Sequence, residues 1–287
     1  MAGIFALLTM LFLASLLTEA SAHVLALYVF EDAIVDGGNT QPTPPHGIDL
    51  NTTISIRWTN EKLMLISLVN FGFFLLLLSV SVSLSPSLLF FMVLYPMILE
   101  ISSYTSGLEI SKTDVNYGQV GCGLLHRTGP KNCSFEDQIG QFNLTVANDL
   151  TKAFNEQELV QHLTSSVFLV SFGINDYSPN YLSSGVVSKM APQEFAKMLL
   201  NEMSMALKTL YRLSARKFVV KNIWPLWRTP NFLIIPYSNS LPSMLNDLQF
   251  YLTGDAFSHS NDFLFVTALM QNSGKYGYGK LLLNYDI

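Results

Sequence analysis

Short apolar runs that could be buried on both faces of a sheet most constrain what this chain can fold into. They are Val24–Phe30 (VLALYVF), Ser166–Phe172 (SVFLVSF), Phe218–Val220 and Phe263–Val266. Continuous apolar runs, in contrast to alternating ones, are typical of strands inside a parallel sheet. The sequence therefore predicts a strand in each run.

Helical patterns lie between these runs. Gln157–Leu163 precedes the second run, and farther along Pro192 suits a first helical position while Glu194 adds negative charge to the first turn. One apolar stripe at near-helical spacing follows, made of Phe195, Leu199, Met203, Ala206, Leu210 and Leu213. Because strands alternate with helices, we predict an α/β fold, a three-layer sandwich whose site lies at the carboxyl ends of parallel strands.

The amino terminus resembles a targeting segment. Ile4–Leu17 is apolar, and the small residues Ala20, Ser21 and Ala22 follow it. This pattern predicts a signal peptide at 1–22 and secretion of a single domain at 23–287, the alternative being a buried helix of the mature fold. Neither a metal nor a cofactor is expected in that domain.

Features of the remaining chain agree with an oxidising compartment. Three sequons, at Asn51, Asn132 and Asn143, predict N-glycosylation. Cys122 and Cys133 are the only two cysteines, and they could form a disulfide there or remain small core residues.

An apolar block at 63–99 contains no charged residue and interrupts the domain. Leu63–Ser85 is long enough to cross a bilayer, which predicts possible membrane association or anchoring in the secretory pathway. Arg57 and Lys62, however, precede it, and the positive-inside rule would place them in the cytosol, whereas a cleaved signal peptide places Asn51 outside. A membrane span and a buried or misassembled segment both stay open.

Composition and spacing argue against several other functions. The net charge is −5, only 13% of the residues are charged and no basic block occurs, so nucleic-acid binding is not expected. The run Gly118–Gly123 lacks the G-x-G-x-x-G pattern and a P-loop lysine, which argues against nucleotide binding. His23, His46, His126 and His162 show no metal-ligand spacing.

Five segments carry a resemblance to a known family. Tyr28–Asn39 (YVFEDAIVDGGN) is similar to the pattern F-G-D-S-L-x-D-x-G-N that opens plant GDSL esterase/lipases. Further similar segments follow in the family's order: Val115–Leu125 (VNYGQVGCGLL), Phe172–Tyr177 (FGINDY), Ala215–Leu226 (ARKFVVKNIWPL) and Gln271–Gly277 (QNSGKYG). The resemblance covers most of Val24–Gly277 except the apolar block.

The resemblance implies an SGNH-hydrolase-like sandwich and hydrolysis of carboxylic esters, such as acyl lipids, by a Ser-His-Asp triad. Carried over, Asn175 and either Gly121 or Gly123 match the donors of the oxyanion hole, and Asp32 matches a residue that we expect to shape the loop. Ala33 stands at the position of the nucleophilic serine, and a methyl group cannot attack a carbonyl.

Other departures from the family follow. Glu31 replaces a glycine, which adds bulk and charge at a turn expected to be tight. The family's D-x-x-H block does not occur before Ile287, so we expect a fold incomplete at its carboxyl end and no triad aspartate or histidine. Asp255–His259 holds an acid, a hydroxyl and an imidazole, but it is interpreted as a solvated loop.

Three hypotheses about function stay open, so the sequence does not decide whether this chain is an enzyme. It could be a secreted GDSL-type ester hydrolase, inactive as written. It could instead be a pseudoenzyme that binds an acyl or glycan ester without cleaving it. It could also be a misassembled product with a membrane-like segment.

Overall fold

A computed structural model describes the chain at residues 25–32, 102–103, 114–126, 128, 133–181, 189–225, 231–264 and 267. The predicted signal peptide, the apolar block and the positions Ala33, Asn51 and Asn132 lie outside the described residues. Among the described helices, none is both long and apolar enough to cross a membrane. Leu63–Ser85 lies outside the described residues.

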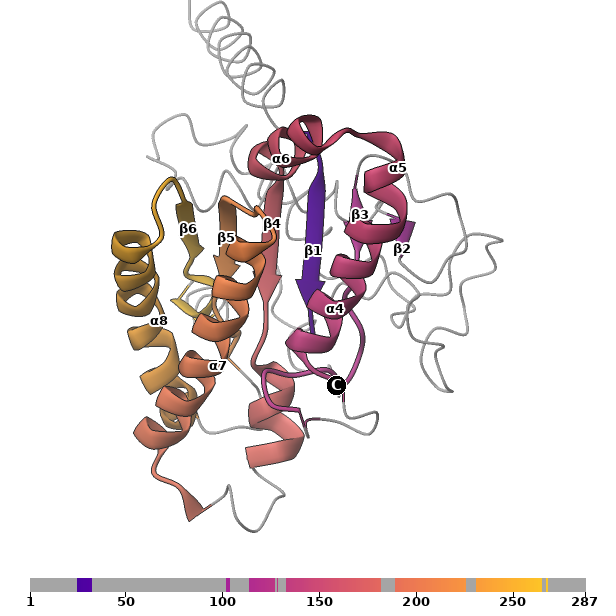
Figure 1. The fold of residues 1–287 in the computed structure, drawn as a ribbon. Coiled ribbons are helices and arrows are strands. Elements are labelled where there is room, and N and C mark those ends of the chain that lie inside the picture. The colour runs from indigo at the N-terminus through magenta and orange to yellow at the C-terminus, as the bar shows by residue number, and fades with distance from the viewer. Residues whose placement is uncertain are drawn as a thin grey trace, which may run out of the picture.

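The described strands form one parallel sheet (Figure 1). They are β1 (Leu27–Glu31), β2 (Ser102–Ser103), β3 (Val115–Asn116), β4 (Val167–Ser171), β5 (Lys217–Lys221) and β6 (Ala256–Ser260). Their order across the sheet is β2-β3-β1-β4-β5-β6. Together with the flanking helices, this sheet confirms the predicted α/β class.

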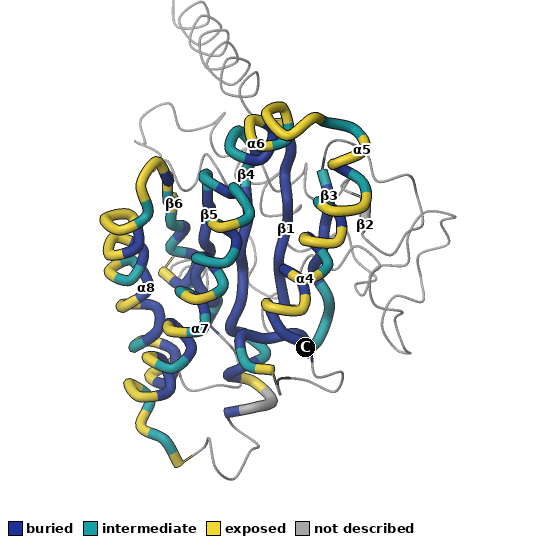
Figure 2. The backbone as a smooth tube through the Cα atoms, in the orientation of Figure 1, coloured by how far each residue is buried: buried dark blue, intermediate teal, exposed yellow. Residues whose placement is uncertain are grey.

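The central strands owe their place to their apolar composition. Every residue of β1 is buried, and β4 is buried except at its first residue (Figure 2). The rings of Tyr28 and Phe168 face each other in register with centroids 5.2 Å apart, and Phe142 packs edge-on against both. Aromatic pairs at such distances add stability beyond the area that they bury.

Helices with identifiable start signals flank the sheet. They are α4 (Phe135–Thr145), which continues through η2 (Val146–Leu150) into α5 (Thr151–Ala153), then α6 (Glu156–Ser165), η3 (Asp176–Tyr181), α7 (Pro192–Arg212) and α8 (Asn231–Tyr251). Ser134 and Asp137 form a capping box at α4, as do Asn155 and Glu158 at α6, which satisfies backbone donors that a helix start leaves free. Pro192 begins α7 as predicted.

The long helix α7 carries the predicted stripe against the core. Phe195, Leu199, Met203 and Leu210 are completely buried. In the view of Figure 1, α7 and α4 lie over the same face of the sheet, and α8 packs against α7 and β6. Hence the helices predicted at Gln157–Leu163 and from Pro192 onward are confirmed.

The last predicted strand is wrong. Residues 262–264 are helical, and the sixth strand is β6 at Ala256–Ser260, which overlaps the segment interpreted as a solvated loop. Since β6 pairs with β5 alone among the described strands, its side chains alternate between exposed and more buried positions. An edge strand of this kind tolerates Ser258 and His259, so it lacks the continuous apolar pattern that marks the inner strands.

Candidate functional site

Three loops meet at the carboxyl ends of the central strands. Asp32 follows β1, Gly121 lies in the loop after β3, and Asn175 lies just after β4. The chain places β3 on one side of β1 and β4 on the other, so these loops flank the point where the strand order reverses. Ligand sites of open parallel sheets lie at such a point.

The side chain of Asp32 fixes the turn after β4. Its Oδ2 accepts hydrogen bonds from the backbone N–H groups of Gly173 at 2.9 Å, Ile174 at 2.8 Å and Asn175 at 3.4 Å. Gly173 has a φ of +123°, a conformation that side chains disfavour. The expected loop-shaping role of Asp32 therefore has a geometric basis.

The backbone carbonyl of Asp32 joins the other two loops. Its oxygen accepts from the backbone N–H of Gly121 at 3.1 Å and from the Asn175 side-chain amide at 2.7 Å. The same Nδ2 of Asn175 also donates to the carbonyl oxygen of Cys122 at 2.8 Å. Thus the structure brings together Asp32, Gly121 and Asn175, but their donors bond to acceptors of the chain itself.

Gly123 lies in the same loop but serves packing. Its N–H donates to the carbonyl oxygen of Cys133 at 3.2 Å. A Cβ at this position would lie 2.5 Å from the Cβ of Thr128 and 2.7 Å from Oδ1 of Asp176. Glycine is required there because these two side chains fill the space beside the backbone.

Sequence reasoning missed the role of Asp176, which anchors the loop of Gly123. Its Oδ2 accepts from the N–H of Leu124 at 2.8 Å, and its Oδ1 accepts from the N–H of Leu125 at 3.1 Å and the hydroxyl of Thr128 at 2.6 Å. The signal was its place directly after Asn175 in the FGINDY segment. Asp32 and Asp176 together link all three loops.

Burial governs the electrostatics of this site. It raises the pKa of Asp32 well above the usual value, and the nearby acidic groups Glu31 and Asp176 raise it further. Burial also raises the pKa of Asp176, although its hydrogen bonds offset part of the effect. Glu31 ends β1 with only 2% of its surface exposed and pairs with Ser171, so the expected tight turn at Glu31 is instead a strand end.

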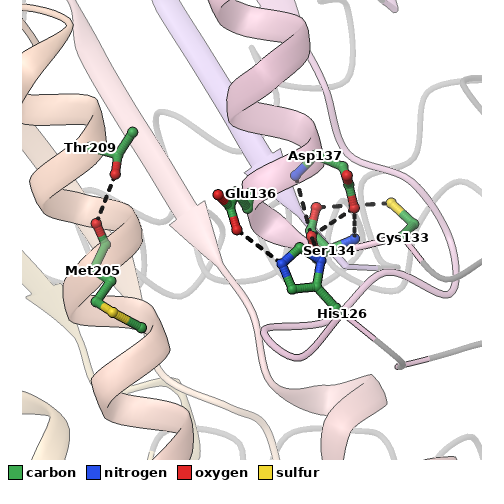
Figure 3. Close-up of polar contacts among 7 residues, drawn as sticks. All are labelled: His126, Cys133, Ser134, Glu136, Asp137, Met205 and Thr209. Carbon is green, nitrogen blue, oxygen red and sulfur yellow. Dashed lines mark hydrogen bonds and ion pairs between the residues drawn. The ribbon is translucent and has the colours of Figure 1, made fainter.

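The disulfide between Cys122 and Cys133 connects the loop after β3 to the start of α4. Next to it, Oγ of Ser134 lies 3.3 Å from Nδ1 of His126, and Nε2 of His126 lies 2.9 Å from Glu136 (Figure 3). The buried Ser134 hydroxyl, however, donates to Asp137 at 2.7 Å and caps α4. It is therefore a structural hydroxyl, despite its triad-like neighbours.

The other described histidines lie away from Asp32. Nε2 of His162, on α6, bonds to the Tyr28 hydroxyl at 3.0 Å. Helix α6 lies at the amino end of β1 (Figure 1). His259 lies on β6, and β4 and β5 separate β6 from β1. Three strand spacings amount to about 14 Å. Within the described part of the chain, no group of three or more His, Cys, Asp or Glu residues could hold a metal ion.

Comparison with known proteins identifies the relatives of this chain. No family model matches it. GDSL esterase/lipase 7 of Arabidopsis thaliana is 26% identical over 288 residues, covering 88% of this chain and 72% of the relative. GDSL esterase/lipase At4g16230 of the same plant is 27% identical, covering 90% of this chain and 73% of the relative. GDSL esterase/lipase At1g71691, also from that plant, is 25% identical and covers 91% and 69%, respectively.

These matches extend over most of the chain. They agree with the parallel α/β sheet, and with the family-like segments, which occur in the family's order and lead into the loops at the carboxyl ends of the strands. The relatives are named as esterases and lipases, which makes the family one of ester hydrolases. These similarities, at 25–27% identity over about nine tenths of the chain, support its membership of the plant GDSL esterase/lipase family.

Proposed function

We propose that this chain is a secreted GDSL-family protein that is built on an ester-hydrolase fold but does not hydrolyse esters. The names of the relatives indicate that the inherited substrates are small-molecule or lipid carboxylic esters. The observation that carries the proposal is Ala33, which directly follows Asp32 at the carboxyl end of β1.

Residue 33 is where the resemblance places the nucleophile. A serine hydrolase needs a hydroxyl at that position and a base that removes its proton. Alanine supplies no hydroxyl. The described histidines also offer no base, because His126 bonds to Ser134 and Glu136, His162 bonds to Tyr28, and His259 lies three strands away from β1.

Hydrolysis of short acyl esters tests this proposal directly. We expect the purified chain to match a mock-purified control, since loss of one triad unit in a serine hydrolase lowers turnover by about 10⁶. Asn175→Ala serves as the site control, because hydrolysis at the inherited site would depend on that residue. Saturable hydrolysis by the unmodified chain would refute the proposal, and its persistence in Asn175→Ala would locate the activity elsewhere.

Ala33→Ser asks whether the nucleophile alone is lacking. We expect neither turnover nor strong labelling of the new serine by a fluorophosphonate probe, because a serine hydroxyl without a base is a poor nucleophile. Strong labelling with turnover would show that a residue of this chain already acts as the base. His259→Ala in the same background would then identify or eliminate that histidine.

Secretion is supported by the apolar run and small residues at 1–22, and by the disulfide between Cys122 and Cys133. The side chain of Asn143 is exposed on α4, in agreement with a glycan at that sequon. We expect cleavage near Ala22 and glycans on Asn143 or on the sequons outside the described residues. An intact Met1 with every sequon asparagine bare, shown by mass analysis of secreted or microsomal protein, would contradict this.

A further inference from the structure

One carbonyl oxygen lies where two side-by-side donors converge at the candidate site. We propose that the backbone carbonyl oxygen of Asp32 fills the inherited oxyanion position, so that the donors of Gly121 and Asn175 are bonded to the protein itself. We call this arrangement of Asp32, Gly121 and Asn175 the lock. The inference rests on the proposed function, since it assumes that these residues occupy the family's site.

The distances are those that an oxyanion hole requires. Donors of such a hole lie 2.7–3.1 Å from the oxygen that they stabilise. The Asp32 oxygen lies 2.7 Å from Nδ2 of Asn175 and 3.1 Å from the backbone nitrogen of Gly121. A substrate oxygen and the Asp32 oxygen cannot both occupy that point.

No donor of Asn175 is left over for a ligand. A side-chain amide has two N–H donors, and here one bonds to Asp32 and the other to the carbonyl oxygen of Cys122 at 2.8 Å. The alternative glycine donor is also used, because the N–H of Gly123 bonds to Cys133. All three candidate groups for the oxyanion hole are therefore satisfied within the protein.

Several constraints hold the carbonyl in place. The side chain of Asp32 accepts hydrogen bonds from three backbone N–H groups of the turn after β4. Asp32 is therefore held through its side chain as well as through its carbonyl oxygen. The disulfide of Cys122 holds the second acceptor of Asn175. The donors would become free only if the Asp32 peptide rotated and these contacts separated.

Hydrogen exchange of the unmodified protein tests the lock without any activity. By NMR, the backbone N–H of Gly121 and both side-chain N–H groups of Asn175 should exchange slowly. The matched control is Asn201, whose side chain is exposed on α7. We expect Asn175 hydrogens to exchange more than about tenfold slower than those of Asn201, because exchange requires local opening of the bonded loops. Equally fast exchange at both asparagines would overturn the lock.

Thermal unfolding gives a second, independent measurement. Asn175→Ala removes the hydrogen bonds of Asn175 to the Asp32 and Cys122 carbonyls, while the Asp32 oxygen keeps the N–H of Gly121. The loss of two hydrogen bonds should lower Tm by about 4–12 °C. Asn201→Ala should change Tm by less than about 2 °C. If the oxyanion hole were open, Asn175→Ala should leave Tm unchanged or raise it, because groups kept for catalysis commonly reduce stability.

The two proposals can fail separately. Should Asn175→Ala not fold, the exchange experiment on the unmodified chain still decides whether the lock exists. Ester hydrolysis by the unmodified chain would refute the proposed loss of activity. Fast exchange combined with an unchanged Tm would refute the lock even if the chain is inactive.

Discussion

Replacing Gly173 with alanine should destabilise the whole site, for two reasons that can be separated. Gly173 has a φ of +123°, and its N–H donates to Oδ2 of Asp32 at 2.9 Å. A Cβ on Gly173 would also lie 2.5 Å from Cδ1 of the buried Ile223, which follows β5. The substitution therefore adds backbone strain and a steric overlap.

Both contributions have known sizes. A non-glycine residue at positive φ costs about 1–2 kcal/mol, and overpacking a core costs about 1–3 kcal/mol. Gly173→Ala should thus lower the free energy of unfolding by about 2–5 kcal/mol. Ile223→Val removes Cδ1 and costs about 0.5–1.5 kcal/mol alone. In the double variant the closest contact, with Cδ1, is removed and the 3.0 Å approach to Cγ1 remains, so the two effects should be less than additive by about 1–2 kcal/mol.

Urea unfolding followed by circular dichroism measures these differences through the midpoint and slope of each curve. Gly140→Ala is the control, because Gly140 is exposed in the middle of α4 and a Cβ there meets no atom within 4 Å. That substitution should raise stability by about 0.5–1 kcal/mol. A Gly173→Ala variant as stable as the unmodified chain, or strict additivity with Ile223→Val, would refute the reasoning.

Three further predictions concern stability away from that turn. Burial raises the pKa of Asp255 to about 6 despite the opposing effect of Arg216, so as pH falls the folded chain binds this proton before the unfolded chain does. The free energy of unfolding of the unmodified chain, relative to that of Asp255→Asn, should therefore rise between pH 6 and 3.8 and level off below pH 3.8. Asn155→Ala removes the cap of α6 and should cost about 1 kcal/mol in thermal or urea unfolding, whereas Asn155→Asp should cost less. Replacing both Cys122 and Cys133 with alanine opens a loop with a sequence separation of 11. The unfolded chain then gains conformational entropy, so the free energy of unfolding should fall by about 3 kcal/mol, and equal stability with and without the disulfide would contradict this prediction.

Apolar runs and helical stripes predicted the interior of the sheet well, because burial on both faces leaves a direct record in the sequence. β1, β4 and β5 were found this way, as was the buried stripe of α7. The pattern fails at the sheet edge, where β6 keeps polar side chains. It also misses α8, whose Pro236 and Pro242 are poor helix formers in isolation and are held by packing against α7.

The candidate site could likewise be predicted from the sequence only in part. The resemblance assigned Asp32, Asn175 and either Gly121 or Gly123 to one site, and the structure brings Asp32, Gly121 and Asn175 together. The identity of the hydrogen-bond acceptors could not be predicted, since it depends on where the Asp32 and Cys122 carbonyls point. The role of Asp176 likewise emerges only from the path of the loop that it anchors.

The parallel sheet also determines when this protein can fold during synthesis. The central strand β1 is translated first among its neighbours, but its partner Val167 lies 140 positions after Leu27. At about 5–20 residues per second, a ribosome needs about 7–28 s to make that intervening chain. Throughout this interval the apolar residues of β1 have no β4 ladder to join, and exposed apolar segments of this kind are prone to aggregation. Slower translation after residue 32 should therefore reduce the yield of folded protein unless chaperone capacity rises with it.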